Sequence, residues 1–480
     1  MDKILNNNAI FLVLYLLTPF LTACTLGIFR FIKNPIFIRR FCKSFFIFEI
    51  LLLFFIKSCS FNFLGCNFIL NNELLILLFV VGFVFLLFSF FSKTFISFNK
   101  KIFYLVLVLL FGLLNLFILA NNVIFALVCL FCLILVQYLL SSIVFSDNNL
   151  KLSAKKQLMF DIGCYFLAVC LISYDFLRYF VIKEIPFEYS TMTNYFSYID
   201  NRAILAVYMG FLLLIFRQFG FLNIFNKYNK LYIKKPFYAV SIMSFVECIM
   251  GVSLLLKVYR TFDYLFYQYQ NSMVLFLLIN LAYFTLTSFD VKNLLKTINS
   301  IFIVNVILGI FSIFVFSKIE NPIVFYYFIV LILSYLLVLF VFSILEKTFK
   351  TKDIGDFKRI NDKTKTIQLF VLFSLLNFAK LPVCANFFAF LFCILTAASI
   401  RFNSMLLNAM PYIMVVCLFF VGISVFNIIF KILIEPADSD DKRHILFKHQ
   451  KIVLLLLIFF MFILLLVCQE FIDKLCIGIF

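Results

Sequence analysis

Long runs of apolar residues, separated by short stretches that carry charge, Asn or Pro, extend along the whole chain. Most of these runs approach or exceed about 18 residues, the length that an α-helix needs to cross the hydrocarbon core of a membrane. The pattern predicts an all-α polytopic membrane protein with about 14 transmembrane helices. The runs lie at residues 9–29, 44–58, 74–92, 102–120, 122–146, 157–182, 203–226, 236–258, 272–289, 299–317, 322–346, 366–400, 405–430 and 450–472.

The distribution of basic residues supports this helix count. Seven segments that join an odd-numbered run to the next even-numbered run hold 29 of the 41 Lys and Arg residues. In a 14-helix arrangement all seven lie on one face, and basic loops face the cytoplasm or the mitochondrial matrix. Because the count is even, both termini are predicted on the opposite face. The segments are residues 30–43, 93–101, 147–156, 227–235, 290–298, 347–365 and 431–451.

The overall composition excludes several classes of protein. The 480 residues are 65% apolar and 13% charged, whereas about 25% of the residues of a water-soluble domain are charged. The basic loops account for much of the net charge of +18, so this charge does not indicate a nucleic-acid partner. Residues 9–29 are long enough to span the membrane and precede no small-residue cleavage site, so we interpret them as a helix rather than a signal peptide.

Residue types that form metal, redox or nucleotide sites do not occur in suitable patterns. Cys129 and Cys132 form a CxxC pair, but they lie in an uncharged apolar run, where cysteines usually pack. The two histidines, His444 and His449, lie in a charged loop and do not indicate a metal site. The chain also lacks P-loop, GxGxxG and GxSxG motifs. We therefore expect no cofactor and no metal in this chain.

Two of the apolar runs contain residues that interrupt helices. The run 366–400 is too long for one simple crossing and has Pro382 near its middle, which predicts a break near Leu381. The run 203–226 contains Gly220, which predicts a break or an early end there. A cation shortly precedes each interruption, Arg217 in the earlier run and Lys380 in the later one.

Corresponding interruptions in two halves of a membrane protein point to an internal repeat. The predicted organisation is a single membrane domain with two five-helix repeats at residues 102–260 and 272–431. Residues 1–101 would supply three preceding helices, and residues 432–480 the last one.

Ionisable residues at membrane depth are the candidate functional residues, because each costs about 2.5–3.5 kcal/mol on insertion scales. Arg217, Glu247 and Lys380 are predicted to form a polar line for proton transfer. Glu247 and Lys380 would exchange protons, whereas the guanidinium group of Arg217 stays charged. The structural alternative is a buried ion pair, or cations that reach lipid phosphate. Asp161 is expected as a neutral or paired carboxyl group, and Lys257 as a side chain that reaches the interface.

Three stretches, taken in order, resemble the antiporter-like membrane subunits of respiratory complex I. Leu152–Phe166 (LSAKKQLMFDIGCYF) is similar to the family's loop and sixth helix, and Thr287–Ile310 to its polar turn and the following helix that ends in Gly-Ile. Lys352–Phe390 is similar to the amphipathic loop and broken twelfth helix of the subunit 2 branch, although Asn386-Phe387 also resembles the subunit 4 branch. The resemblance covers most of the chain at low identity. It implies inverted repeats, with helices seven and twelve interrupted.

The chain departs from this family's pattern at its charged positions. The fifth-helix glutamate has no counterpart, and Cys129 or its neighbours take its place. The seventh-helix lysine corresponds to Arg217, and Glu247 lies near the position of the eighth-helix lysine. The charged residue that follows the twelfth-helix break corresponds to Phe390, while Lys380 precedes the break. Membership in the complex is therefore better supported than independent proton pumping.

The resemblance implies a divergent membrane-arm subunit of mitochondrial NADH:ubiquinone oxidoreductase, in the inner membrane and in contact with other membrane-arm subunits and lipids. Its redox centres would lie in other chains. The chain would contribute to proton translocation or, given the lost charges, to the structure of the arm. A different reading is a 14-helix lipid-linked oligosaccharide flippase, which would line its cavity with several cations for a pyrophosphate group.

We expect the loop 347–365 to face the matrix. A cysteine introduced at Lys358 should react with a membrane-impermeant thiol reagent only after the inner membrane is permeabilised, because basic loops remain on that side. A cysteine introduced at Ser197, between the sixth and seventh runs, is the matched control and should react in intact membranes. Labelling of K358C before permeabilisation would contradict the predicted topology.

Overall fold

The arrangement of these runs in space comes from a computed structural model. It describes residues 7–28, 34–63, 66–95, 100–144, 148–173, 187–192, 201–221, 236–289, 293–315, 322–349, 354, 365–381, 384–399, 404–434, 447 and 449–463. Within these ranges, 11 helices are long and apolar enough to cross a membrane. Shorter apolar helices are Thr366–Phe378, Ala385–Leu395 and His449–Ile463. The prediction of a largely helical, multi-pass membrane protein is confirmed.

The chain divides into two units, and each is described by itself. The first unit comprises Met1–Lys235 and Ile242–Leu265, and the second comprises Pro236–Ser241 and Phe266–Phe480. The elements of the first unit are α1 (Asn7–Ile28), α2 (Pro35–Leu53), β1 (Cys59–Phe63), β2 (Cys66–Leu70), α3 (Asn72–Phe95), α4 (Lys100–Leu119), α5 (Val123–Val144), α6 (Asn148–Ser173), α8 (Tyr189–Met192), α9 (Asn201–Gln218) and most of α11 (Phe237–Thr261). The short helix α12 (Asp263–Gln268) crosses the boundary, and the second unit continues with α13 (Gln270–Ser288), α14 (Leu294–Val315), α15 (Pro322–Phe349), α16 (Lys365–Phe378), α17 (Ala385–Ser399), α18 (Met405–Asn408), α19 (Met410–Ile429) and the π-helical turn η5 (Phe430–Ile434). The proposed division into two five-helix repeats stays a prediction.

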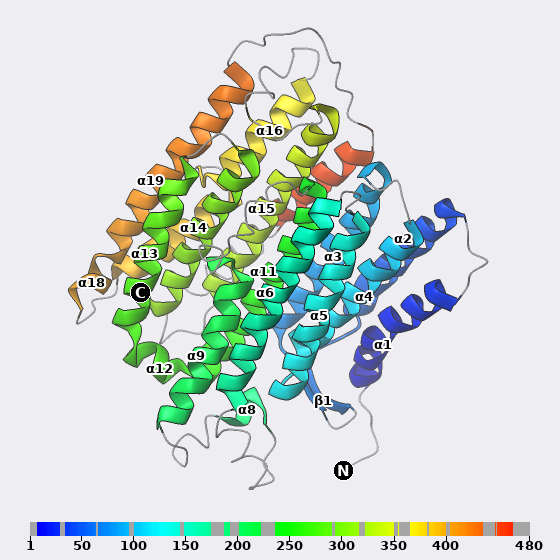
Figure 1. Cartoon of the computed structure of the whole chain (residues 1–480), viewed down its shortest axis with the longest axis horizontal. Helices are drawn as coiled ribbons and strands as arrows, with labels where there is room; N and C mark the ends of the chain where they lie inside the picture. The colour runs from blue at the N-terminus through cyan, green and yellow to red at the C-terminus, as the bar shows by residue number, and fades with distance from the viewer. Residues whose placement is uncertain are drawn as a thin grey trace. The chain divides into compact units, whose positions relative to one another are not determined.

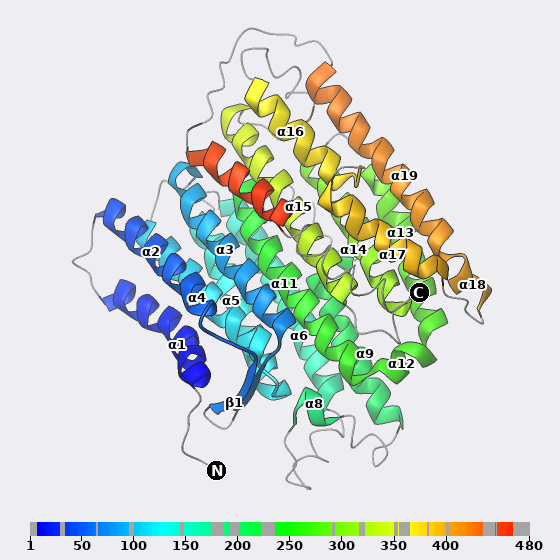
Figure 2. The same ribbon diagram turned by 180° about the vertical axis from the view of Figure 1, so that it is seen from behind.

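In the first unit, α4 packs against α1, α2, α3 and α5. The ribbon views show α1 and α2 next to α4 (Figures 1 and 2). The ring of Phe111 on α4 is central to this packing, because it meets Tyr15, Phe45, Phe46 and Phe85 at centroid separations of 6.2, 6.1, 5.4 and 5.4 Å. Aromatic pairs in this edge-to-face geometry stabilise packing beyond the area that they bury.

In the second unit, α15 is the most enclosed of the described membrane-spanning helices, because every residue of its most apolar stretch is buried. It packs against α14, α16 and α17. A helix that is apolar all round belongs in such a position. Near its end, Glu346 accepts a hydrogen bond of 2.7 Å from the backbone N–H of Phe237, at the first turn of α11. A carboxylate in this position stabilises a helix N-terminus.

Two helices begin nine residues earlier than the apolar runs predict. Helix α2 starts at Pro35 rather than residue 44, with the side chain of Asn34 accepting from the N–H of Ile36 at 2.9 Å. Helix α6 covers Asn148–Ser173 rather than 157–182. The first turns of both helices carry Lys and Arg, and counting apolar residues alone assigns such turns to loops. The last part of this predicted run, residues 174–182, lies outside the described residues.

A β-hairpin that the hydrophobic pattern does not predict joins α2 to α3. Strands β1 and β2 pair antiparallel, with Cys59 opposite Leu70. The hairpin is anchored by Asn67, whose carbonyl accepts from the N–H of Asn121 at 3.0 Å and whose side-chain amide donates to Glu188. Asn121 also donates to Glu188 through its side chain, at 3.0 Å. Polar side chains therefore tie three connecting segments together at one end of the first unit.

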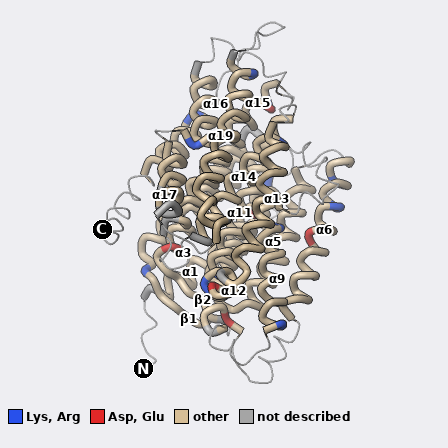
Figure 3. The backbone as a smooth tube through the Cα atoms, turned by 90° about the vertical axis from the view of Figure 1, so that its left-hand side faces the viewer, with Lys and Arg blue, Asp and Glu red and all other residues tan. Residues whose placement is uncertain are grey.

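Both predicted helix interruptions are present. Helix α9 ends at Gln218, and Gly220 adopts a φ of 81° that glycine allows at low cost. Helix α16 ends at Phe378 and α17 begins at Ala385, so the run 366–400 is divided. Pro382 itself lies outside the described residues. The charge distribution fits a membrane environment, because the middle parts of the described helices contain few Lys, Arg, Asp or Glu residues (Figure 3).

Candidate functional site

Arg217 is the central residue of the candidate site in the first unit. It lies in the last turn of α9, where the negative end of the helix dipole favours a cation. Its side chain is 8% exposed, and that of Asp161 on α6 is 16% exposed. The Nε of Arg217 donates to Oδ1 of Asp161 at 2.7 Å, and Nη2 donates to the same oxygen. The structure therefore pairs this guanidinium group with a carboxylate from the neighbouring helix.

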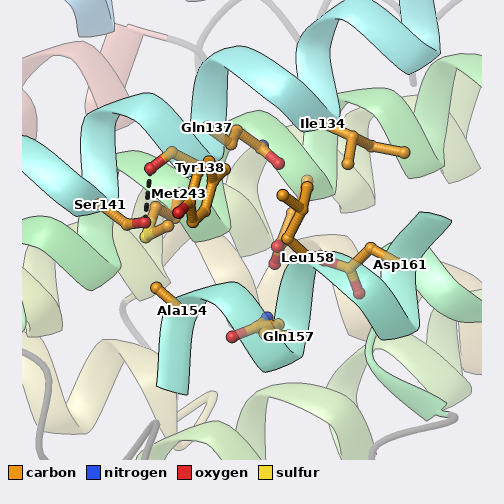
Figure 4. Close-up of a pocket in the computed structure, with 10 residues that line it drawn as sticks. Ile134, Gln137, Tyr138, Ser141, Ala154, Gln157, Leu158, Asp161 and Met243 are labelled. Atoms are coloured by element: carbon orange, nitrogen blue, oxygen red, sulfur yellow. Dashed lines mark hydrogen bonds between the residues drawn. The ribbon is translucent and has the colours of Figure 1, made fainter. Parts of the chain in front are cut away.

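A small polar cavity adjoins this ion pair. Its volume of about 20 Å³ is enough for one water molecule. Figure 4 shows Gln137 and Ser141 of α5 on one side and Gln157 and Asp161 of α6 on the other. Glu247 of α11 completes this set of polar residues. The other lining residues are Ile134, Tyr138, Ala154, Leu158 and Met243.

Two of the three predicted site residues therefore belong to one site. Glu247 lines the cavity, and its charge acts on Arg217. The predicted proton line omits Asp161, although the sequence identifies it as a carboxyl group at membrane depth. The α5 residues that line this cavity include Gln137 and Ser141 but not Cys129. The acidic partner comes from α6 because α6 and α9 pack together along their lengths.

Lys257 occupies a separate position near the end of α11. Its Nζ donates to the carbonyl oxygens of Phe117 and Ala120, each at 2.7 Å. Carbonyl groups in the last turn of a helix lack partners within that helix, so Lys257 caps the C-terminal end of α4. Lys257 and Arg260 both line a larger cavity of about 260 Å³. Arg260 pairs with Glu73 at 2.6 Å.

Lys380 forms the candidate site of the second unit. It is 1% exposed and follows the end of α16 with a φ of 57°, a left-handed conformation that few residues other than glycine adopt. Its Nζ donates to the hydroxyl of Tyr327 at 2.6 Å, and that hydroxyl donates to the carbonyl of Asn305 at 2.6 Å. The same Nζ lies 3.9 Å from the ring centroid of Phe390, an arrangement that stabilises a desolvated cation.

Lys380 lies close to the position where the resemblance implies a charged residue. The resemblance implies a charged residue at the position of Phe390, and here the ammonium group of Lys380 lies over that ring. Gly309 on α14 permits this arrangement, because a Cβ there would lie 2.5 Å from the ring of Tyr327. Across the break, the side chain of Asn386 donates to the carbonyl of Asn377 at 3.2 Å. This bond satisfies a carbonyl group near the end of α16.

The predicted polar line thus corresponds to two local sites, one in each unit. Arg217 and Glu247 belong to the first, with Asp161 added, and Lys380 belongs to the second. Among the described residues, no group of three or more His, Cys, Asp or Glu side chains is placed to hold a metal ion.

The comparisons with known proteins concern the fold. No protein-family model and no curated protein matches the sequence. Two structures of respiratory complex I from Thermus thermophilus contain similar chains. The one with bound NADH has a TM-score of 0.76 at 13% identity, covering 93% of this chain and 93% of that chain. The one with bound Aureothin has a TM-score of 0.74 at 13% identity, covering 94% and 97%.

A chain of the Mrp complex from Dietzia sp. DQ12-45-1b is also similar, with a TM-score of 0.74 at 10% identity, covering 90% of this chain and 82% of that one. The chain therefore shares its fold, over nearly its full length, with membrane chains of these two complexes.

We expect Asp161→Asn to destabilise the first unit by about 3 kcal/mol or more, because it leaves a buried guanidinium group without its carboxylate. The double variant Asp161→Asn with Arg217→Gln should lose less than the sum of the two single variants, as measured by thermal unfolding. Glu73→Gln removes a carboxylate from the exposed pair with Arg260 and is the matched control, with an expected cost below about 1 kcal/mol. Additive losses at Asp161 and Arg217 would show that the two are not coupled.

Proposed function

We propose that this chain is an antiporter-like membrane-arm subunit of mitochondrial NADH:ubiquinone oxidoreductase and contributes to proton translocation. The observation that carries the proposal is the likeness in fold to a chain of complex I, which extends over 93% of both chains. The sequence motifs favour subunit 2 over subunit 4. Redox chemistry belongs to other chains of the complex, and this chain holds no cofactor of its own.

In this proposal the chain crosses the inner membrane fourteen times. Helix α2, the α16–α17 pair and the helix His449–Ile463 add three crossings to the 11 long spans. The two five-helix repeats, residues 102–260 and 272–431, each contain one of the interrupted helices. Each repeat then contributes one of the two polar sites.

The first site works with a permanent positive charge. Arg217 stays protonated, so its role is to stabilise the ionised form of nearby carboxyl groups. Asp161 holds the guanidinium through two hydrogen bonds, and Glu247 lies beside the same polar cavity. Glu247 is therefore the group that gains and loses a proton. Water in the cavity and the amide groups of Gln137 and Gln157 would connect it to its surroundings.

The second site works with a cation that can lose its proton. Lys380 donates to Tyr327, and the hydroxyl of Tyr327 can pass a hydrogen bond onward or reverse its direction. Lys380 is enclosed by protein, so its charged form depends on Tyr327 and on the face of Phe390. A lysine in this setting suits reversible proton transfer better than an arginine does.

The contacts of these two cations count against a lipid-linked oligosaccharide flippase. Such a carrier needs cations whose donors are available to a pyrophosphate group. Arg217 already donates to Asp161, and Lys380 donates to Tyr327 beneath the ring of Phe390. The alternative to proton transfer is a purely structural role within the arm, and replacement of Lys380 by Met distinguishes the two.

Isolation of the epitope-tagged chain from native membranes in mild detergent should yield a large complex with NADH:quinone reductase activity. The chain's extensive apolar surface suits packing against other membrane chains as well as lipid. An unrelated tagged multi-pass protein from the same membranes is the control for unspecific recovery. Recovery of the chain as a stable monomer without this activity would contradict the proposal.

Replacement of Lys380 by Met should leave assembly intact but lower the number of protons moved per electron. If proton transfer at this site limits turnover, NADH oxidation should also fall by about tenfold or more. Lys151→Met, which removes an exposed lysine from α6, is the matched control and should change neither quantity. Normal assembly with unchanged proton-to-electron ratio and unchanged NADH oxidation would show that Lys380 moves no protons and that the second site is structural.

A further inference from the structure

A buried carboxyl group lies in the N-terminal helices, apart from both sites of the proposed function. Glu49 of α2 is 0% exposed. The hydroxyl of Thr18 on α1 donates to its Oε1. Its other oxygen, Oε2, is buried and makes no hydrogen bond within the described part of the chain. One half of this carboxyl group is therefore bonded and the other half is not.

Two further buried polar side chains lie in this part of the N-terminal helices. Tyr15 of α1 is fully buried and lies near both Glu49 and Asn115 of α4. Asn115 is also 0% exposed, and neither its Nδ2 nor its Oδ1 is hydrogen-bonded in the described structure. Leaving buried polar atoms unpaired is costly. Glu49, Tyr15 and Asn115 therefore form a buried polar cluster in which several atoms lack hydrogen-bond partners.

The packing of α1 on α4 brings these residues together. Gly112 of α4 lies against α1, since a Cβ there would be 2.8 Å from the Cβ of Pro19. Asn115 follows Gly112 by about one turn, and Tyr15 precedes Pro19 by about one turn. The ring of Tyr15 packs edge-on against Phe111 at 6.2 Å. The polar group is thus enclosed by apolar side chains from the same helices.

The basic residues of α2 are Arg39, Arg40 and Lys43, which precede Glu49 by six residues or more, at least one and a half turns of helix. Among the described residues, Glu49 forms no ion pair, and α1 carries no charged side chain. Lys43 on α2 lies over the ring of Phe90, with its Nζ 3.5 Å from the centroid. Lys100 and Lys101 are at the far end of α4. An isolated carboxylate in an apolar interior costs several kcal/mol, which protonation avoids.

We propose that Glu49 is a proton-binding site that joins α1, α2 and α4, independent of Arg217, Glu247 and Lys380. The proton resides on Oε2, while Thr18 continues to donate to Oε1. One proton therefore removes the unpaired charge and gives the unbonded oxygen a hydrogen to donate.

The direct test is the infrared difference spectrum between the wild-type chain and Glu49→Gln, recorded on the assembled membrane complex at pH 7. The proposal predicts a carboxylic-acid C=O band in the wild type that E49Q lacks. Glu73→Gln, which removes the carboxylate paired with Arg260, is the matched control and should remove carboxylate bands instead. Carboxylate bands in the Glu49 difference spectrum would overturn the proposal.

Stability as a function of pH provides a second measurement. Because the folded state would bind one more proton than the unfolded state, the folded-to-unfolded ratio of the wild type should fall by up to about tenfold per pH unit from about pH 5 upward, until Glu49 itself ionises in the folded state. E49Q imitates the protonated group and should lack this component. Failure of E49Q to assemble while Glu49→Asp assembles would show that the negative charge is required, and would overturn the proposal. A Na⁺-dependent stabilisation that E49Q abolishes would identify a metal cation in place of the proton, with the same consequence.

Discussion

The cost of holding a charged side chain inside a membrane governs how this chain is built. Each membrane-embedded cation described above has a specific partner. Arg217 has the carboxylate of Asp161, Lys380 has the hydroxyl of Tyr327, and Lys257 has two backbone carbonyls of α4. These partners come from neighbouring helices, so the helices cannot shift far without exposing a charge. Removing one partner is more costly than the pair is worth, because an unpaired charge remains.

All three cations also lie at the C-terminal ends of helices. Arg217 is in the last turn of α9, Lys380 directly follows α16, and Lys257 caps α4. Unsatisfied carbonyl groups and the negative end of the helix dipole favour cations at such positions. An interrupted helix places one of these ends within a membrane-spanning segment. The end of α9 and the break between α16 and α17 therefore create the places where a cation can be held inside the protein.

The need of a buried cation for a partner also explains why the carboxylate at the first site can come from α6. The family resemblance implies an acidic residue on the fifth helix, and the structure instead has Asp161 on α6 and the neutral Gln137 on α5. What a buried guanidinium requires is a carboxylate within hydrogen-bonding distance, and a neighbouring helix can supply it equally well. The resemblance implies a lysine at position 217, and the arginine found there keeps its proton. The proton exchange that we propose for this site therefore falls to a carboxyl group such as Glu247.

The amino-acid sequence by itself determined the membrane class, the approximate positions of most helices and the interruption near Leu381. These features follow from local composition, because about 20 apolar residues or a proline act through the chain's own backbone. The apolar pattern does not predict the early starts of α2 and α6, because the first parts of both helices carry basic residues and a count of apolar residues assigns such segments to loops. The pairing of Arg217 with Asp161, the contact of Lys380 with Tyr327 and Phe390, and the group around Glu49 depended on tertiary structure. Each brings together side chains from different helices, and only the packing of those helices decides which side chains meet.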